Sequence, residues 1–365
     1  MPGVPKPPSR ETVELADQLA LRIAQGHFLD YLPGERRLAE HLNVPLRRIR
    51  HAVALLEKRG LVERIPARGT RLRARDDGGR SETLFDRIVL VALDRPMGTV
   101  FFQQILGRLR RWADRLHAVT EPLRGWSDER TDPLAAISSR QLARSAFVFA
   151  AAAPDAALKR LRQHDRPFVL IEHLPDDGAT GVNAALLDHR NGVALAVEHL
   201  TDLGHRRIAM AGNFEESWVF RERLAGFREG LARRGLAELP ELHVKYVDLP
   251  GDRYDLFVPL RAVLGRPDRP TALVAVGGTA GLDILKICAH DRIAVPGQLS
   301  VVAVCSTIPE ASRAKKPTTV EIGRPQDLAD IAASLLLRPG SEPEPLVLRP
   351  MPRMQVRKST GPPPH

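Results

Sequence analysis

The sequence predicts an α/β protein in which a small helical module precedes a large region of parallel β-sheets. The first fifth of the chain holds three short amphipathic helical patterns, whereas from Arg87 onward apolar runs alternate with helical segments. Such alternation is typical of parallel sheets that helices cover on both faces. With 365 residues, 43% of them hydrophobic, the chain is long enough for two or three domains.

The positive charge of the chain is concentrated near its beginning. The net charge is +10, and residues 1–75 hold 15 Lys and Arg against 8 Asp and Glu. Localised basic charge favours a polyanionic partner, although many folds carry basic patches without one. The sequence contains no apolar run of membrane-spanning length and no cysteine motif, and we expect no secretory leader because residues 1–10 include no apolar stretch. We therefore expect a cytoplasmic protein with no membrane partner, no cofactor and no metal.

Two helices are expected after a proline-rich start, residues 1–10, which we predict to be disordered. In residues 12–26 the apolar side chains recur on one face, namely Leu15, Ala16, Leu19, Ala20 and Ile23. The segment ERRLAEHL, residues 35–42, forms a second short helix whose inward side chains are Leu38, Ala39 and Leu42.

A third helix follows the turn NVP and runs to about Arg59. Its inward face consists of Ile49, Val53 and Leu56, and its opposite face carries Arg47, Arg50, His51 and Ala54. After Gly60, the segment LVERIPARGTRLR predicts two strands joined by the turn at residues 66–69.

Three helices with a basic two-stranded wing make a winged helix-turn-helix. One helix fits the major groove of DNA, where guanidinium groups bind phosphates or guanine edges. Glycine at position 69 permits close approach of the wing tip, beside Arg68, to the DNA backbone. A basic helical bundle that binds another protein is the alternative interpretation.

The runs LPGERRLAEHLNV (32–44) and IRHAVALLEKRGLVERIPARGT (49–70) resemble the GntR-type winged helix. The resemblance implies DNA-contacting roles for several residues, to which the exposed face adds His51: Arg36, Arg47, Arg48, Arg50, Arg68, Gly69 and Thr70. The sequence departs from the family pattern at Gly34, where serine is common, and at Pro45 and Leu46, where serine and arginine are usual. These departures put the family's base preference in doubt.

The larger region begins after a charged, glycine-containing linker, residues 74–86. Strands are expected within residues 87–94, 145–152, 167–173, 207–212 and 271–277. Helices are expected within residues 101–116, 153–164, 191–204 and 220–235.

Six segments of this region, in one order, resemble the effector domain of the LacI/GalR regulators. They are residues 197–212, 221–235, 269–276, 295–304, 316–322 and 355–360. The resemblance implies the two-lobed periplasmic-binding-protein fold, with a ligand cleft between the lobes at the carboxyl ends of the strands. It also implies three crossings between lobes, near Asp188, Ile322 and Pro345.

These expectations divide the chain into a winged helix domain, residues 11–73, and an effector-binding domain, residues 87–360, with a tail at 361–365. Lobe 1 is expected at about 87–187 and 322–340, and lobe 2 at about 188–321 and 341–360.

The resemblance implies an effector site that departs from that of sugar-binding relatives. Asn-Asp is usual where this chain has Gly277-Gly278, and aspartate is usual where it has Cys305-Ser306. Loss of these polar groups weakens discrimination between sugars. Arg223 matches the ligand-contacting arginine, and the other candidates are Asp94, Phe101, Trp218, Gly277 and Cys305.

Each effector candidate also has a structural interpretation. Arg223 can pair with Glu222 or Glu229 on its own helix, while Phe101 and Trp218 suit a core equally well. Cys305 is more often a small buried apolar residue than a redox sensor.

Catalytic motifs are absent from the sequence, which contains neither G-x-S-x-G nor the phosphate loop G-x-x-x-x-G-K-[ST]. The histidines are scattered, so no H-E-x-x-H zinc site forms. We therefore expect no enzymatic activity.

The combined expectation is a transcriptional regulator, most commonly a repressor in this family, whose effector is a small molecule, with a sugar as the candidate. A homodimer would bind an imperfect palindrome of double-stranded DNA, because paired recognition helices need half-sites about one turn apart. The linker residues Asp76, Asp77, Gly78 and Gly79 offer no hinge helix, so little operator kinking is expected. The alternatives are a constitutive DNA-binding regulator with a degenerate effector domain used for dimerisation, and a periplasmic-type ligand-binding module.

Overall fold

The computed structural model divides the chain into two compact units, and its described residues are 9–24, 28, 31–42, 44–66, 69–72, 85–92, 99–123, 131–150, 152–175, 181–215, 217–249, 253–306, 316–337 and 345–364. Unit 1 comprises Met1–Leu186 and Gln326–Met351, and unit 2 comprises Leu187–Pro325 and Pro352–His365. Arg68, Asp94 and the linker residues Asp76 to Gly79 lie outside the described residues.

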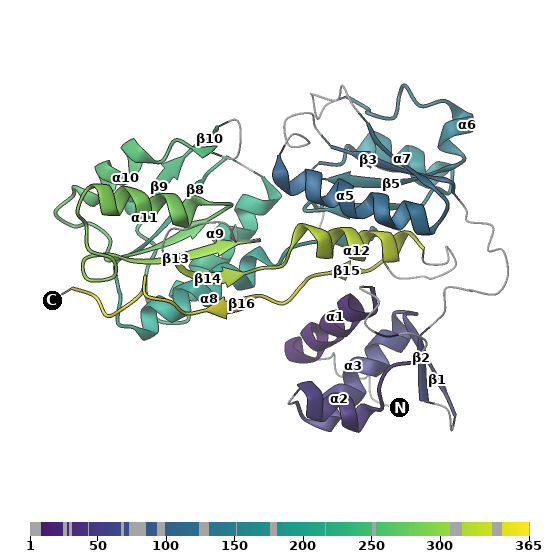
Figure 1. The fold of residues 1–365 in the computed structure, drawn as a ribbon, viewed down its shortest axis with the longest axis horizontal. Helices are drawn as coiled ribbons and strands as arrows, with labels where there is room; N and C mark the ends of the chain where they lie inside the picture. The colour runs from purple at the N-terminus through teal and green to yellow at the C-terminus, as the bar shows by residue number, and fades with distance from the viewer. Residues whose placement is uncertain are drawn as a thin grey trace, which may run out of the picture. The chain divides into compact units, whose positions relative to one another are not determined.

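The N-terminal module of unit 1 has three helices and a two-stranded wing (Figure 1). Its elements are α1 (Arg10–Ala24), α2 (Glu35–Leu42), α3 (Leu46–Lys58), β1 (Val62–Ile65) and β2 (Gly69–Leu72). The strands pair antiparallel, with Val62 opposite Leu72 and Arg64 opposite Thr70. Both Val62 and Leu72 are buried, so the wing is anchored at the end away from its turn.

The rest of unit 1 is built on a six-stranded, parallel sheet in the order β15-β7-β6-β5-β3-β4. Its strands are β3 (Arg87–Val91), β4 (Val119–Leu123), β5 (Ser145–Ala150), β6 (Phe168–Ile171), β7 (Ala184–Ala185) and β15 (Val347–Leu348). Its helices are α5 (Val100–Arg115), α6 (Ser139–Leu142), α7 (Asp155–Gln163) and α12 (Pro325–Leu336). Asp330 of α12 accepts hydrogen bonds from Arg108 Nε (2.6 Å) and Trp112 Nε1 (2.6 Å), which fixes α12 beside α5.

Unit 2 has a second six-stranded sheet, in the order β16-β14-β13-β12-β8-β9, in which only β16 runs antiparallel to its neighbour. Its strands are β8 (Ile208–Asn213), β9 (Val244–Tyr246), β12 (Ala272–Val276), β13 (Ser300–Cys305), β14 (Thr318–Glu321) and β16 (Arg353–Gln355). A short hairpin, β10 (Asp248–Leu249) and β11 (Arg253–Tyr254), follows β9.

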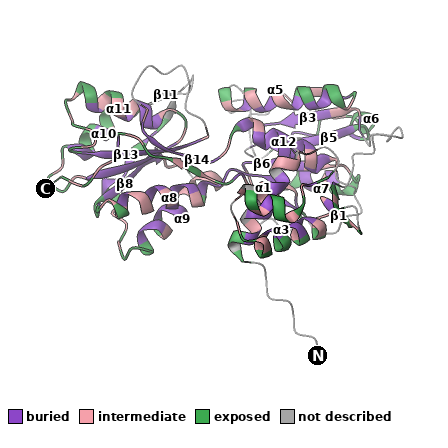
Figure 2. Cartoon of the chain, turned by 60° about the horizontal axis from the view of Figure 1, so that its bottom comes forward, coloured by how far each residue is buried: buried purple, intermediate pink, exposed green. Residues whose placement is uncertain are grey.

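Helices cover both faces of the unit 2 sheet (Figure 1). They are α8 (His189–Asp202) and α9 (Trp218–Ala232) on one face, and α10 (Phe257–Leu264) and α11 (Ala280–His290) on the other; a 3₁₀ turn, η1, spans Pro240–Leu242. The central strands β12 and β13 are buried along their whole length, and Figure 2 shows buried strands such as β13 and β5 in the two sheets. Burial on both faces explains why these strands read as continuous apolar runs.

The last crossing between the units differs from the sequence expectation. Residues 341–360 were expected in lobe 2, but β15 pairs with β7 in the unit 1 sheet, and the chain enters unit 2 only at Pro352. The segment LVLRP is too short and too little alternating to reveal which of two sheets it joins. No helix among the described residues is long and apolar enough to cross a membrane.

Candidate functional site

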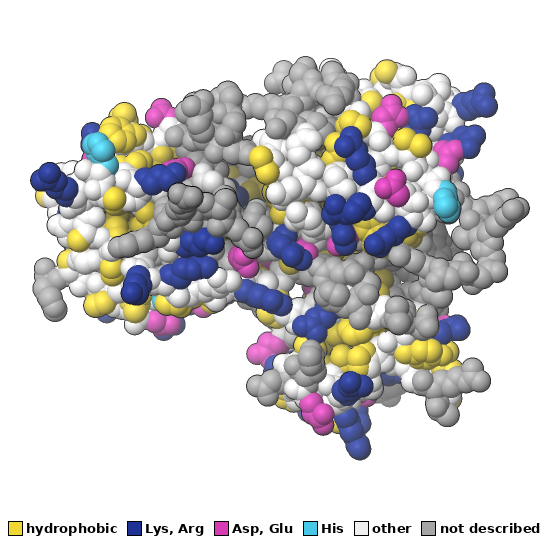
Figure 3. Space-filling model, in the orientation of Figure 1, with side chains coloured by type: hydrophobic (Ala, Val, Ile, Leu, Met, Phe, Trp, Pro, Cys, Tyr) yellow, Lys and Arg dark blue, Asp and Glu magenta, His cyan; other side chains and the backbone are white. Residues whose placement is uncertain are grey.

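Helix α3 presents a polar face whose helical phase agrees with the sequence pattern. Its buried side chains are Ile49, Ala52, Val53 and Leu56, and its exposed residues include Arg47, Arg50, His51 and Ala54. Arg36, on α2, is also exposed. Figure 3 shows basic and acidic side chains together on the visible face of this module. The positive charge of the module is therefore partly compensated by its own carboxylates.

The three arginines of α3 differ in how their charge is compensated. Arg48 forms an ion pair with Glu11 of α1, and Arg50 donates from Nε to Glu35 Oε2 at 3.2 Å. Arg47 is exposed and forms no ion pair among the described residues. Arg47 therefore presents the least compensated charge of the three.

A fourth arginine, Arg64 of β1, belongs to the same surface and was not predicted from the sequence. Its Nη2 donates to Glu35 Oε1 at 3.2 Å and to the backbone carbonyl of Arg50 at 3.3 Å. Its backbone N–H donates to Glu57 Oε1 at 3.1 Å. The strand Val62–Ile65, VERI, does not alternate polar and apolar residues, so the sequence reveals neither the orientation of Arg64 nor its partners.

The wing places Gly69 and Thr70 at the start of β2, where Gly69 has a φ of +104°. This left-handed conformation strains any residue with a Cβ, so glycine is required at the turn. Thr70 is partly exposed, and its carbonyl accepts the N–H of Leu32, which fastens the wing to the body of the module.

The arginines of α3 and β1 have side chains that are suited to binding phosphate groups. Guanidinium groups bind phosphates and the O6/N7 edge of guanine, and helix α3 has the dimensions that the major groove accepts. Among the described residues, no cluster of His, Cys, Asp and Glu could hold a metal ion.

A second group of candidate residues lies in unit 2, where α8 and α9 pack closely. A Cβ at Gly226 would lie 2.1 Å from the carbonyl oxygen of Arg190, and a Cβ at Gly230 would lie 2.8 Å from Val197 Cβ. Glycine at these two positions of α9 therefore allows the helix backbones to approach.

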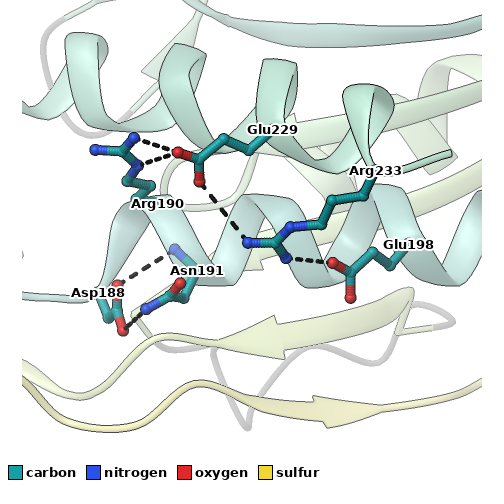
Figure 4. Close-up of polar contacts among 6 residues, drawn as sticks. All are labelled: Asp188, Arg190, Asn191, Glu198, Glu229 and Arg233. Carbon is teal, nitrogen blue, oxygen red and sulfur yellow. Dashed lines mark hydrogen bonds and ion pairs between the residues drawn. The ribbon is translucent and has the colours of Figure 1, made fainter. Parts of the chain in front are cut away.

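Ion pairs reinforce this helix contact (Figure 4). Arg190 donates from Nε to Glu229 Oε1 at 2.9 Å, Arg233 lies 3.9 Å from the other oxygen of Glu229, and Arg233 also pairs with Glu198. Asp188 caps α8 by accepting the N–H of Asn191 at 3.2 Å. Glu229, one of the two glutamates expected as partners of Arg223, is thus paired with Arg190 and Arg233.

The close packing brings the N-terminal parts of α8 and α9 together around His189. Arg223 Nε lies 3.4 Å from His189 Nδ1, and the rings of His189 and Trp218 meet edge to face with centroids 6.1 Å apart. Trp218 and Arg223 are partly exposed, whereas His189 is buried. His189 was not predicted from the sequence, because a histidine at a helix start carries no distinguishing spacing.

Gly277 directly follows β12, and Cys305 is the last residue of the adjacent strand β13. Gly277 has a φ of +106° and donates its N–H to the carbonyl of Val304, and Tyr246 Oη donates to the carbonyl of Val276 at 2.6 Å. Cys305 is 2% exposed. Burial, followed by the charge of Glu321, raises the pKa of its thiol to about 12. The thiol is protonated at neutral pH, which argues against a redox sensor.

The two remaining effector candidates, Phe101 and Asp94, belong to unit 1. Phe101 belongs to α5 of unit 1, where it is partly exposed and packs edge to face on Phe102 at 5.2 Å. Asp94 lies outside the described residues.

Comparison with protein families identifies both parts of the chain. Residues 11–72 match the gntR family of bacterial regulatory proteins, and residues 197–360 match the periplasmic binding protein-like domain.

Curated relatives match parts of the chain. The "Lactose operon repressor" of Escherichia coli (strain K12) is 27% identical over 128 residues, which are 35% of this chain and 34% of the relative. The "Probable opine utilization operon repressor" of Rhizobium rhizogenes is 30% identical over 151 residues, 39% of this chain and 73% of the relative. The chain thus spans only about a third of the lactose repressor.

Solved structures match more of the chain. A LacI-family transcriptional regulator from Sanguibacter keddieii has a TM-score of 0.58 and 25% identity, covering 76% of this chain and 98% of its own. The regulator CelR in complex with cellobiose has a TM-score of 0.58 and 18% identity, covering 90% and 100%. The chain therefore carries a LacI-type, periplasmic binding protein-like domain and, at its N-terminus, a domain of the gntR family, and its homologues are transcriptional regulators.

Proposed function

We propose that this chain regulates transcription by sequence-specific binding to DNA, and that a small molecule controls its affinity for the operator. Residues 11–73 would bind DNA, and residues 87–360 would bind the effector. The observation that carries the proposal is the exposed face of α3, with Arg47, Arg50 and His51 beside a glycine-containing wing. Repression by a homodimer on an imperfect palindrome is the mode we propose.

The proposed DNA contacts divide into two kinds. Arg47, which pairs with no carboxylate among the described residues, is suited to phosphate, and Arg50 is suited to a base edge. Arg36, Arg48 and His51, together with the wing residues Arg68, Gly69 and Thr70, would fix the register of the protein on the duplex. Arg48 would first have to leave Glu11.

The proposed effector is a sugar, bound at the carboxyl end of the unit 2 sheet. A relative of this fold was solved with cellobiose and another with ribose. Trp218 would stack on a sugar ring, and Arg223 would donate hydrogen bonds to its hydroxyl groups. Phe101, Asp94, Gly277 and Cys305 remain proposed members of the site.

Fluorescence polarisation with DNA from the gene's own upstream region tests this proposal. We expect tight binding that weakens steeply with salt, because phosphate contacts release counterions, and that changes when one member of a sugar panel is added. Equal affinity for the upstream DNA and for a shuffled duplex would contradict sequence-specific regulation.

A second candidate, constitutive DNA binding with a degenerate effector domain, is favoured by one observation. Gly277 contributes no side chain, and the thiol of Cys305 is buried, so two strand ends offer an effector no polar side chain. Operator binding that no small molecule alters would support this candidate.

A further inference from the structure

We infer that Glu35 is a positioning residue that orients Arg50 for reading one base pair, an inference that rests on the proposed function. Glu35 is the first residue of α2, and both of its carboxylate oxygens are engaged. Oε2 accepts from Arg50 Nε at 3.2 Å, and Oε1 accepts from Arg64 Nη2 at 3.2 Å. One carboxylate therefore joins α2, α3 and the wing.

Glu35 binds Arg50 through Nε, and this determines which hydrogen-bond donors of Arg50 remain available to DNA. A guanidinium group is planar, so a bond at Nε restricts both its plane and its direction. The side chain remains 59% exposed, and among the described residues its hydrogen bond to a carboxylate is made from Nε. With Nε bound to Glu35, the Nη1–Nη2 edge is left to donate two parallel hydrogen bonds to guanine O6 and N7. Glu35 thus fixes the side of the guanidinium that faces the protein and leaves the reading edge open.

Arg64 keeps Glu35 in place. It binds the second carboxylate oxygen, the carbonyl of Arg50 and, through its backbone N–H, Glu57 at the end of α3. The Glu35 side chain is 28% exposed, less than that of either arginine. Holding a long side chain before binding reduces the rotamer entropy that binding would otherwise cost.

Glu35 also affects non-specific binding. A carboxylate beside a DNA-binding helix repels phosphates and lowers affinity for every sequence equally. If its only effect were charge, removal would strengthen binding to all DNA. If it orients Arg50, removal strengthens non-specific binding but weakens discrimination at one base pair. A merely structural role would lower both affinities together.

The test starts by selecting a binding site from a random-sequence duplex library with the full-length protein. The variant Glu35→Gln keeps the size of the side chain but removes the charge. The control Glu40→Gln removes the same charge from an exposed position of the same helix. For each protein, affinity is measured for the selected site, for all single-base variants of it and for a shuffled duplex.

For Glu35→Gln we expect discrimination at one position to fall about tenfold, the value of a well-placed bidentate contact. The same position should lose its preference in Arg50→Ala, and Glu35→Gln should add nothing further in that background. Glu40→Gln should retain full discrimination. Unchanged discrimination in Glu35→Gln, or a loss at positions that Arg50→Ala does not affect, would overturn the inference.

A second variant is used if Glu35→Gln fails to fold. Arg50→Lys keeps the positive charge but lacks the bidentate edge, so the preference at the same position should be lost. A retained preference in Arg50→Lys refutes the inference. If the wild-type protein enriches no sequence at all, the proposed function fails and the inference fails with it. If the wild-type protein enriches a site and Glu35→Gln discriminates between the variants of that site as the wild-type protein does, the inference is wrong but the proposed function stands.

Discussion

At the scale of single residues, neighbouring arginines on one helix face have different electrostatic roles. Arg50 and Arg48 are each paired with a carboxylate of another helix, whereas Arg47 is exposed and unpaired among the described residues. A paired arginine contributes direction more than net charge, and an unpaired one contributes net charge to the interaction with phosphate.

The replacement Arg47→Ala should therefore weaken binding to all DNA sequences about equally. We expect the slope of log affinity against log salt to decrease by about 1, as for the loss of one phosphate contact. Arg266→Ala, which removes the same charge from unit 2, serves as the control. A selective loss at one base pair would instead identify Arg47 as a base-reading residue.

The two cysteines should be inert in the folded protein. Burial raises the pKa of Cys305 to about 12 and that of Cys288 to about 11, so thiolate is scarce at neutral pH. Alkylation should be slow in native buffer and rapid in denaturant, as mass spectrometry can follow. Rapid native modification of Cys305 would revive the redox-sensor interpretation.

At the scale of elements, glycines on α9 determine how closely it approaches α8. Because Arg223 and Trp218 lie on α9 and His189 lies on α8, the same contact places the proposed effector residues together.

The replacement Gly226→Ala should destabilise unit 2 by about 1–3 kcal/mol, because its Cβ would overlap the Arg190 carbonyl and force the helices apart. The control is Gly107→Ala in α5, where a Cβ meets nothing within 4 Å. That change should stabilise its helix by about 0.5–1 kcal/mol. Urea unfolding followed by circular dichroism distinguishes them, and equal midpoints would contradict the close-packing argument.

How far the sequence predicts such features depends on the range of the interaction. Helical periodicity located α2 at residues 35–42 and the buried face of α3, because those patterns are local. The bond from Arg50 to Glu35 joins residues 15 positions apart, and that from Arg64 to Glu35 joins residues 29 positions apart. A single sequence contains no signal for such pairs, so Arg64, Glu35 and His189 emerged only from the structure.

At the scale of the whole molecule, apolar strands alternating with helices predicted parallel sheets, and the resemblance to the LacI/GalR regulators implied two lobes. The assignment of the short strand β15 nevertheless needed its pairing with β7. Two-residue strands carry no periodicity, and their sheet is decided by tertiary contacts alone. The resemblance to the two regulator families supplied the order of the domains, which the comparisons confirm.

The two units should respond differently to mild acid, because three histidines with lowered pKa values lie in unit 2. Burial lowers the pKa of His199, His205 and His243. His243 Nδ1 accepts the N–H of Met210 at 3.1 Å, so the folded state requires that nitrogen to be unprotonated. His205 contacts Thr271 Oγ1 and the carbonyl of Gly361 at 2.9 Å each.

The sign of the pH dependence follows from linkage. Each of these histidines binds a proton less readily when folded than when unfolded, so its contribution to stability is present above the ordinary histidine pKa of about 6.5. That contribution is lost as the pH falls below this value. Unit 2 should therefore unfold at lower urea concentration at mildly acidic pH than at pH near 8. His205→Gln should flatten this dependence even if it lowers stability overall. Urea transitions of unit 2 that do not change over this range would show that the buried histidines are as readily protonated in the folded protein as in the unfolded chain.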